Sequence, residues 1–474
     1  MLELTYQHII GIVVTLVLIT LVGAYSGSKV KTSSDFAVGG KKAGRGIVAG
    51  TIMGTLVGGA STIGTAQLAF LYGFSAWWFT LGAGLGCLIL GLFFSDPLHR
   101  SNKETVPQIL AEEFGGLSKP ISSVFVSLGT FLNIIAQILA AVALMTSMFR
   151  MNPMVAAIIA IILMSAYVIF GGVWGAGLVG VTKLILLYIS VIAGGIIAVS
   201  SAGGIGEFVS AFPKYPYFSL FGRGIWIDGA AGFSLVLGVL STQTYIQAVL
   251  SGKTLKESKT GALISACLIP PIGIAGIFIG LFMKMNHPDM NSASAFPQFV
   301  LEYMNPWLGG IVLATLLVAV VGTGAGLSLG ISTIFTKDIY KNYINKKADD
   351  DKLLKISRLV IVVSLALALL FTTGNAKSLI LKWSFMSMGL RGATVFGPLC
   401  AALFIKGKVK SNYAIASMVI SPLSVLLGKL FLPQSFDPLF LGIGISFMLI
   451  ILGIFASRSH HTIENFHYKI MKRD

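Results

Sequence analysis

The sequence predicts an all-α membrane protein that crosses the bilayer thirteen times. Hydrophobic residues make up 55% of the 474 residues and charged residues only 11%, whereas a typical soluble protein carries about 25% charged residues. The apolar residues gather in runs long enough to cross a bilayer, and most of the basic residues lie between these runs. Neither a metal-binding spacing of cysteine and histidine nor a hydrolytic constellation occurs in the sequence. We therefore expect an integral membrane protein that is not an enzyme and has no organic cofactor.

Each spanning helix needs about 20 apolar residues, because the hydrocarbon core is about 30 Å thick. The first run, 7–26, follows a segment that contains one Glu and no Lys or Arg, so we expect a retained helix and not a signal peptide. The thirteen predicted spans lie near residues 7–26, 47–72, 75–95, 121–148, 154–171, 177–201, 227–250, 260–284, 306–335, 356–373, 379–404, 412–432 and 438–457.

The basic residues are distributed unevenly between the two sets of alternating loops that thirteen spans create. One set holds 25 of the 34 Lys and Arg residues and the other set holds five. Because cytoplasmic loops are enriched in Lys and Arg, we expect a multi-pass protein of the plasma (inner) membrane with its N-terminus outside and its C-terminus in the cytoplasm. The net charge of +16 then faces anionic lipid, and a nucleic acid is not expected as a partner.

Two of the predicted spans are polar and interrupted by glycine. The second span contains Gly58-Gly59, and a five-helix offset separates it from the seventh span. The polar residues concerned are Ser61, Thr62, Thr65 and Gln67 in the second span and Ser241, Thr242, Gln243, Thr244, Tyr245 and Gln247 in the seventh. Interrupted helices at corresponding positions of two halves indicate a transporter with inverted repeats and a binding site at the middle of the membrane. The alternative is that the small residues only allow close helix packing.

Four segments of the chain resemble the sodium:solute symporter family, and they occur in the order of that family. They are Asp35-Phe36 to Lys41, Thr105-Val-Pro107 to Gly115, Gln243-x-x-x-Gln247, and Ser332-Thr-Ile-Phe-Thr336-Lys-Asp338-Ile-Tyr340, which is the most specific of the four. The resemblance implies a leucine-transporter-like fold with two five-helix inverted repeats and discontinuous core helices 1 and 6.

The same resemblance divides the chain into five parts. Residues 44–202 are expected to form the first five-helix repeat (core helices 1–5), and residues 226–405 the second (core helices 6–10). Residues 1–43 would be a first peripheral helix with a basic cytoplasmic loop, residues 203–225 an external loop, and residues 406–474 two peripheral helices and a cytoplasmic tail.

The sodium site of the family combines carbonyl groups of core helix 1 with an Ala-x-x-Ser/Thr-Ser/Thr motif on core helix 8. By matching position, the resemblance implies a Na⁺ site made by the carbonyls of Gly54 and Val57 and by Ala319 and Thr323. Gly322 stands where the family has a hydroxyl group, which leaves this site one oxygen ligand short.

Lys183 is a second departure from the family pattern. The family shows Thr-Asp-x-x-Gln on core helix 5, whereas here the acid is missing and Lys183 stands at the position of the glutamine. A cation buried in the membrane costs about 3 kcal/mol on insertion scales, so a partner or a function is expected. One alternative is that the side chain reaches the cytoplasmic interface. The other is that its ammonium group replaces the Na⁺ ion, as in some amino-acid transporters of the same superfold, which would make the protein H⁺-coupled or Na⁺-independent.

Arg391 lies in the middle of the eleventh predicted span, and an intramembrane arginine indicates a functional site. A guanidinium group binds a carboxylate through two parallel hydrogen bonds, which predicts a carboxylate- or amino-acid-like solute. A structural arginine that joins helix ends is the alternative. Thr80 and Thr242 stand where sugar-transporting members of the family have an acid and an asparagine, which argues against a sugar. The predicted solute-binding residues are Ser61, Thr62, Gln67, Thr80, Thr242, Tyr245 and Arg391.

Together these features predict a secondary active transporter that carries out cation-coupled symport of a small organic solute by alternating access. The resemblance implies Na⁺ as the coupling ion, and Lys183 leaves H⁺ coupling or a Na⁺-independent carrier as the alternative. A transporter-like sensor is a minor alternative. The expected partners are the solute and the lipid bilayer, and no obligate protein partner is evident.

Overall fold

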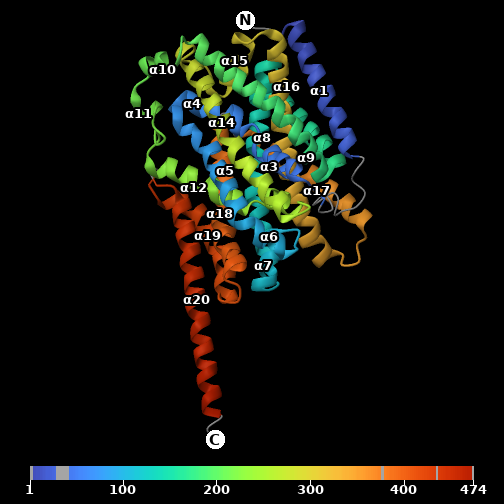
Figure 1. Ribbon diagram of the computed structural model, residues 1–474, viewed down its shortest axis with the longest axis vertical. Coiled ribbons are helices and arrows are strands. Elements are labelled where there is room, and N and C mark those ends of the chain that lie inside the picture. The colour runs from blue at the N-terminus through green and yellow to red at the C-terminus, as the bar shows by residue number, and fades with distance from the viewer. Residues whose placement is uncertain (1–3, 28–41, 375–377, 434–435, 472–474) are drawn as a thin grey trace.

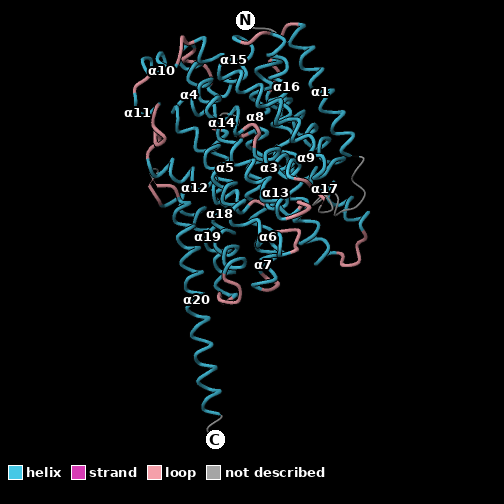
Figure 2. Tube along the Cα trace, in the orientation of Figure 1, coloured by secondary structure: helices cyan, strands magenta, loops and turns pink. Residues whose placement is uncertain are grey.

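The computed structural model describes residues 4–27, 42–374, 378–433 and 436–471, and every regular element in these ranges is a helix (Figures 1 and 2). Within the described residues, nine helices are long and apolar enough to cross a membrane, or ten if one bent pair counts as a single span. The helices form one bundle, and the C-terminal part of α20 (Pro438–Met471) extends away from it (Figure 1).

The helices fall on either side of the loop near residues 202–204. The first group comprises α1 (Tyr6–Gly27), α3 (Arg45–Leu56), η2 (Ala60–Gly64), α4 (Thr65–Tyr72), η3 (Gly73–Trp77), α5 (Trp78–Ile89), η4 (Leu90–Phe94), α6 (Ser95–Ser101), α7 (Val106–Phe114), α8 (Ser118–Phe149) and α9 (Pro153–Ser201). The second group comprises α10 (Ile205–Ala211), α11 (Lys214–Tyr217), α12 (Ile225–Ser241), α13 (Gln243–Leu250), α14 (Leu255–Asn286), η5 (Ser292–Ser294), α15 (Ala295–Tyr303), α16 (Pro306–Ile334), η6 (Phe335–Ile344), α17 (Asp350–Thr373), α18 (Ile380–Phe404), α19 (Ser411–Phe431) and α20.

Local sequence explains where two of the long helices begin. In α9 and α16 an asparagine precedes a proline at the first helical position, where the missing N–H of proline costs no hydrogen bond. The side-chain oxygen of Asn152 accepts a hydrogen bond from the N–H of Met154 at 2.8 Å, and that of Asn305 accepts one from Trp307 at 3.0 Å. These caps satisfy backbone donors that the first turn of a helix leaves free.

Both spans that the sequence predicts to be interrupted are broken in the structure. The first break follows α3, where Val57 has extended φ/ψ angles of −92° and 95°. The second is at Thr242 (φ −90°, ψ 123°), and α12 and α13 meet there at 45°. Ser61 and Thr62 compensate the first break, because the Ser61 hydroxyl accepts from the N–H of Gly58 and the Thr62 hydroxyl donates to its carbonyl, each at 2.9 Å. The prediction of two discontinuous helices is confirmed.

The structure joins the two spans predicted at 154–171 and 177–201 in the single 49-residue helix α9. Helical backbone thus continues between the two predicted spans, which correspond to the apolar stretches Pro153–Val168 and Gly180–Ser201 of this helix. The helix is not straight, however. Tyr167 and Leu186 pack into the same small apolar cluster beside α1 and α16, whereas a straight helix would hold positions 19 residues apart at a separation of about 28 Å. Tyr167 and Leu186 are thus closer together than a straight helix would allow.

Helix α16 is buried along nearly its whole length, and glycines bring both broken helices close to it. A Cβ atom at Gly326 would lie 2.1 Å from the methyl group of Thr55 on α3, and one at Gly330 would lie 2.7 Å from the methyl group of Thr244 on α13. No larger residue fits at either place, so α16 offers a flat surface to α3 and to α13.

Candidate functional site

The ammonium group of Lys183 lies at the first break. Its Nζ atom donates hydrogen bonds to the carbonyl of Gly54 at 2.6 Å, to the carbonyl of Ala319 at 3.2 Å and to the hydroxyl of Thr323 at 3.3 Å. The side chain is 1% exposed. It therefore points into the bundle and does not reach an interface.

The break explains why the carbonyl of Gly54 can accept this bond. In an intact helix that oxygen would accept from the N–H of Gly58, but this N–H donates to the hydroxyl of Ser61 instead. The hydroxyl of Thr323 also lies within hydrogen-bond distance of two break carbonyls, those of Gly54 at 3.2 Å and Val57 at 3.3 Å. The interruption of α3 thus leaves backbone carbonyl oxygens without their helical hydrogen bonds, so that they can bind a cationic group such as the ammonium of Lys183.

The structure brings together all six residues of the predicted cation site. Gly322, where the family has a hydroxyl, contributes no oxygen, and a Cβ atom there would lie 3.7 Å from Nζ of Lys183. In the part of the chain that the structure describes, the ion pairs do not include Lys183. The ammonium charge is compensated by carbonyl and hydroxyl dipoles, which are also the ligands that Na⁺ would need.

Replacing Gly58 by alanine is expected to disrupt the first break. A Cβ atom at this position would lie 2.3 Å from the Thr323 hydroxyl and 2.7 Å from the Gln137 side-chain oxygen. Overpacking of this kind costs about 1–3 kcal/mol, so Tm of the purified protein should fall. Gly46→Ala on α3 is the matched control, because no atom lies within 4 Å of a Cβ atom there. Equal Tm values for the two variants would contradict the close contact.

Helix α8 supports the first break from the other side. The side-chain oxygen of Gln137 accepts a hydrogen bond from the N–H of Gly59 at 2.9 Å, and its amide nitrogen donates to Asn133 at 3.3 Å. Asn133 in turn accepts from the hydroxyl of Ser384 on α18 at 2.9 Å. These hydrogen bonds satisfy the N–H of Gly59, which the break leaves without a helical partner, and they connect the break to α18 through Gln137 and Asn133.

Arg391 on α18 lies at the second break and is fully buried. Its guanidinium donates to the hydroxyl of Thr242 at 2.7 Å, and to the carbonyl and hydroxyl of Ser387 at 3.1 Å and 2.8 Å. One nitrogen also lies 3.2 Å from the sulfur of Met388. The groups that contact the guanidinium are thus all uncharged, and no ion pair among the described residues includes Arg391. An anion at this place would gain a charged partner inside the membrane.

Three more polar side chains at the second break are buried without a hydrogen-bond partner among the described residues. They are the hydroxyl groups of Ser241, Thr244 and Tyr245. Buried polar groups are normally hydrogen-bonded, so these hydroxyls are free to bind polar groups of a ligand. The second break therefore combines a fully buried cation with unused hydroxyls.

The other predicted solute-binding residues use their polar groups in the protein itself. The hydroxyls of Ser61 and Thr62 donate to the carbonyl of Gly58, and that of Thr80 donates to the carbonyl of Trp77 at 3.4 Å. The side-chain oxygen of Gln67 accepts from the N–H of Ile380 at 3.0 Å, which fixes the start of α18. All four are buried, and none of these hydrogen bonds joins them to Arg391.

The sequence model of the sodium:solute symporter family matches residues 36–421. The chain is 23% identical over 439 residues to the sodium/proline symporter of Escherichia coli (strain K12), covering 87% of this chain and 85% of that protein. It is 25% identical over 448 residues to the high affinity choline transporter 1 of Homo sapiens, covering 85% of this chain and 73% of that protein. Its structure is similar to that of a Na⁺-coupled sialic acid symporter in a substrate-bound outward-open state, with a TM-score of 0.79 and 19% identity over 96% of this chain and 98% of that chain. The last similarity shows a shared fold.

Proposed function

The chain belongs to the sodium:solute symporter family, and we propose that it is a secondary active transporter that moves a small organic solute together with a cation by alternating access. The observation that carries this proposal is the pair of helices broken inside the bundle, at Val57 and at Thr242, with a buried cationic side chain at each break. Broken helices expose backbone groups that can bind a solute and an ion at the middle of the membrane.

The proposed topology has thirteen membrane crossings, with the N-terminus outside and the C-terminus in the cytoplasm. The asymmetry of the basic loops supports it, and so does the bend in α9, which lets that one helix cross the membrane twice. Core helices 1–5 and 6–10 would then form the two inverted repeats, with α3 and α4 as broken core helix 1 and α12 and α13 as broken core helix 6.

The coupling ion has two candidates. Family membership favours Na⁺, bound by the carbonyls of Gly54, Val57 and Ala319 and the hydroxyl of Thr323. A specific observation favours the second candidate, in which the ammonium group of Lys183 takes the place of the ion: its Nζ atom donates to three of these four groups. In that case protonation of Lys183 couples transport to H⁺, or the carrier works without an ion.

For the solute we propose a carboxylate group bound at the second break by Arg391, with Thr242 and Tyr245 beside it. Relatives in the family differ in their solutes, since one is a sodium/proline symporter and another a choline transporter. A buried guanidinium whose partners are all neutral favours an anionic group over a cationic solute such as choline.

Uptake into proteoliposomes tests the proposal. The purified protein would be supplied with labelled proline, choline, glucose and short-chain carboxylates, and Na⁺ and pH gradients would be imposed separately. We expect accumulation of a carboxylate-bearing solute under one of the two gradients and none of glucose. Absence of both gradient-driven accumulation and downhill uptake of every solute, with a folded protein, would contradict the assignment.

A further inference from the structure

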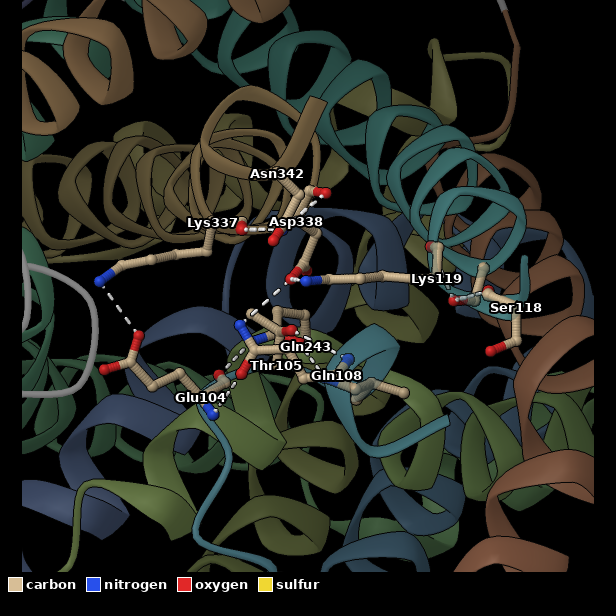
Figure 3. A network of polar contacts seen from close by, with 11 residues as sticks. Glu104, Thr105, Gln108, Ser118, Lys119, Gln243, Lys337, Asp338 and Asn342 are labelled. Carbon is tan, nitrogen blue, oxygen red and sulfur yellow. Dashed lines mark hydrogen bonds and ion pairs between the residues drawn. The ribbon is translucent and has the colours of Figure 1, made fainter. Parts of the chain in front are cut away.

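Three segments that resemble the family are far apart in the sequence, yet they meet in one polar network (Figure 3), at the end of the bundle where α6 and α7 lie (Figure 1). They are the Thr105-Val-Pro107 segment, the start of the Gln243-x-x-x-Gln247 segment, and the Thr336-Lys-Asp338 segment. This end carries the basic loops, and it faces the cytoplasm in the proposed topology. None of these polar groups contributes to the cation site or to the second break.

Gln243 is the first residue of α13, and its side chain ties this half-helix to the start of α7. Its side-chain oxygen accepts a hydrogen bond from the N–H of Val106, and its amide nitrogen donates to the carbonyl of Glu104, both at 2.9 Å. The side chain is 1% exposed. Since both ends of the amide are used, Gln243 holds α13 against α7 in a fixed orientation.

Asp338 makes the second connection, from η6 to α7 and α8. Its carboxylate accepts a hydrogen bond from the side chain of Gln108 at 3.1 Å and lies 3.4 Å from the ammonium group of Lys119. The Asp338 side chain is fully buried, whereas Lys119 is partly exposed. Next to it, Lys337 pairs with Glu104 at 3.1 Å. Four helical segments thus meet in one polar network, which Figure 3 shows.

The position of this network beside α13 suggests its role. A solute released from the second break toward the cytoplasm must pass beside α13, the half-helix that follows the break. α13 packs against α3 and α16, and Gln243 holds it to α7. Gln243 and Asp338 thus join α13 and η6 to α7 and α8 at the end of the bundle toward which the solute would be released.

We propose that Gln243 and Asp338 form an inner latch, which keeps the pathway closed to the cytoplasm and breaks when the solute is released. This inference rests on the proposed alternating-access function. It adds two residues that act on the cytoplasmic release step and do not touch the solute or the ion.

Cysteine accessibility tests the latch without a solute. Thr51 is buried on α3, between the basic end of that helix and the first break, and Thr51→Cys would be introduced after Cys87, Cys267 and Cys400 are replaced by alanine. A membrane-impermeant maleimide would be added to inside-out vesicles. We expect Gln243→Leu and Asp338→Asn each to raise the alkylation rate about tenfold, because the first removes two buried hydrogen bonds and the second removes the charge that pairs with Lys119. Lys103→Met is the control, since it removes an ion pair between the loop before α7 and Glu112 of α7, in which both side chains are partly exposed, and it should leave the rate unchanged.

Unchanged rates in the two latch variants would overturn the proposal, and so would equal acceleration in the Lys103→Met control. If Asp338→Asn does not fold, the exchange Asp338→Lys with Lys119→Asp replaces it. The double variant should react as slowly as the parent, while Lys119→Asp alone should react faster. Because the assay needs no uptake, failure of the latch is distinguishable from failure of the transport proposal.

Discussion

Replacing Lys183 by alanine is expected to create a Na⁺-binding site and to abolish uptake driven by a pH gradient. Removing the ammonium group leaves the carbonyls of Gly54 and Ala319 and the hydroxyl of Thr323 facing an empty volume of about one cation. A bound ion stabilises the folded protein by about 2.7 kcal/mol when its concentration is a hundredfold above Kd. Tm of Lys183→Ala should therefore rise by about 3–6 °C in Na⁺ relative to K⁺, while Tm of the wild type should be equal in the two salts.

Lys256→Ala is the matched control for this measurement, because it removes an exposed lysine of α14. Its Tm should behave as that of the wild type in both salts. A wild-type Tm that rises in Na⁺ but not in K⁺, together with uptake driven by a Na⁺ gradient, would contradict the replacement of the ion by Lys183. Na⁺ would then be the coupling ion, as family membership suggests.

Replacing Arg391 by glutamine is expected to weaken binding of the carboxylate solute about 100-fold. Removing one member of a buried charge pair typically costs about 2–5 kcal/mol, and 2.7 kcal/mol corresponds to a factor of about 100 in Kd. The decisive measurement is the ratio of the affinities for the carboxylate and for its uncharged amide analogue. Loss of a direct contact should bring this ratio close to one, whereas a purely structural arginine would weaken both ligands equally.

Two further variants complete this test. Arg391→Lys keeps the positive charge but loses the planar guanidinium group, whose nitrogens contact Thr242 and Ser387. Because the charge remains, this variant should retain part of the preference for the carboxylate. Lys382→Met on the same helix removes an exposed lysine and should leave the ratio unchanged. An unaltered preference in a folded Arg391→Gln protein would remove Arg391 from the solute site.

Local sequence was sufficient to predict the broken helices, and the resemblance to the family was needed to predict the group that lies at the first of them. Glycines followed by hydroxyl residues weaken a helix wherever it lies, so the interruption at Val57 could be expected before its neighbours were known. Lys183 could be matched to the cation site because the missing hydroxyl at Gly322 and the added ammonium group are complementary changes. The first conclusion depends on residue types at fixed spacing, and the second depends on matching those residues to the family pattern.

Contacts between distant segments could not be predicted in this way. Asn133 and Gln137 stand four residues apart on one face of α8, but only the packed bundle shows that Gln137 binds the backbone of Gly59. Gln67 resembles a solute ligand in the sequence, yet it caps the start of α18. The two separate spans near 154–171 and 177–201 could be predicted from their apolar runs, but the helical backbone that joins them could not.

The glycine face of α16 has a mechanical consequence. Helices whose side chains interlock must separate before they can shift, whereas two smooth surfaces can slide with little change in contact area. Thr55 of α3 and Thr244 of α13 rest on Gly326 and Gly330 of this face. Helix α16 can thus serve as a common sliding surface for both half-helices, and one methyl group added at Gly326 would impede the motion without altering any group proposed to bind solute or ion.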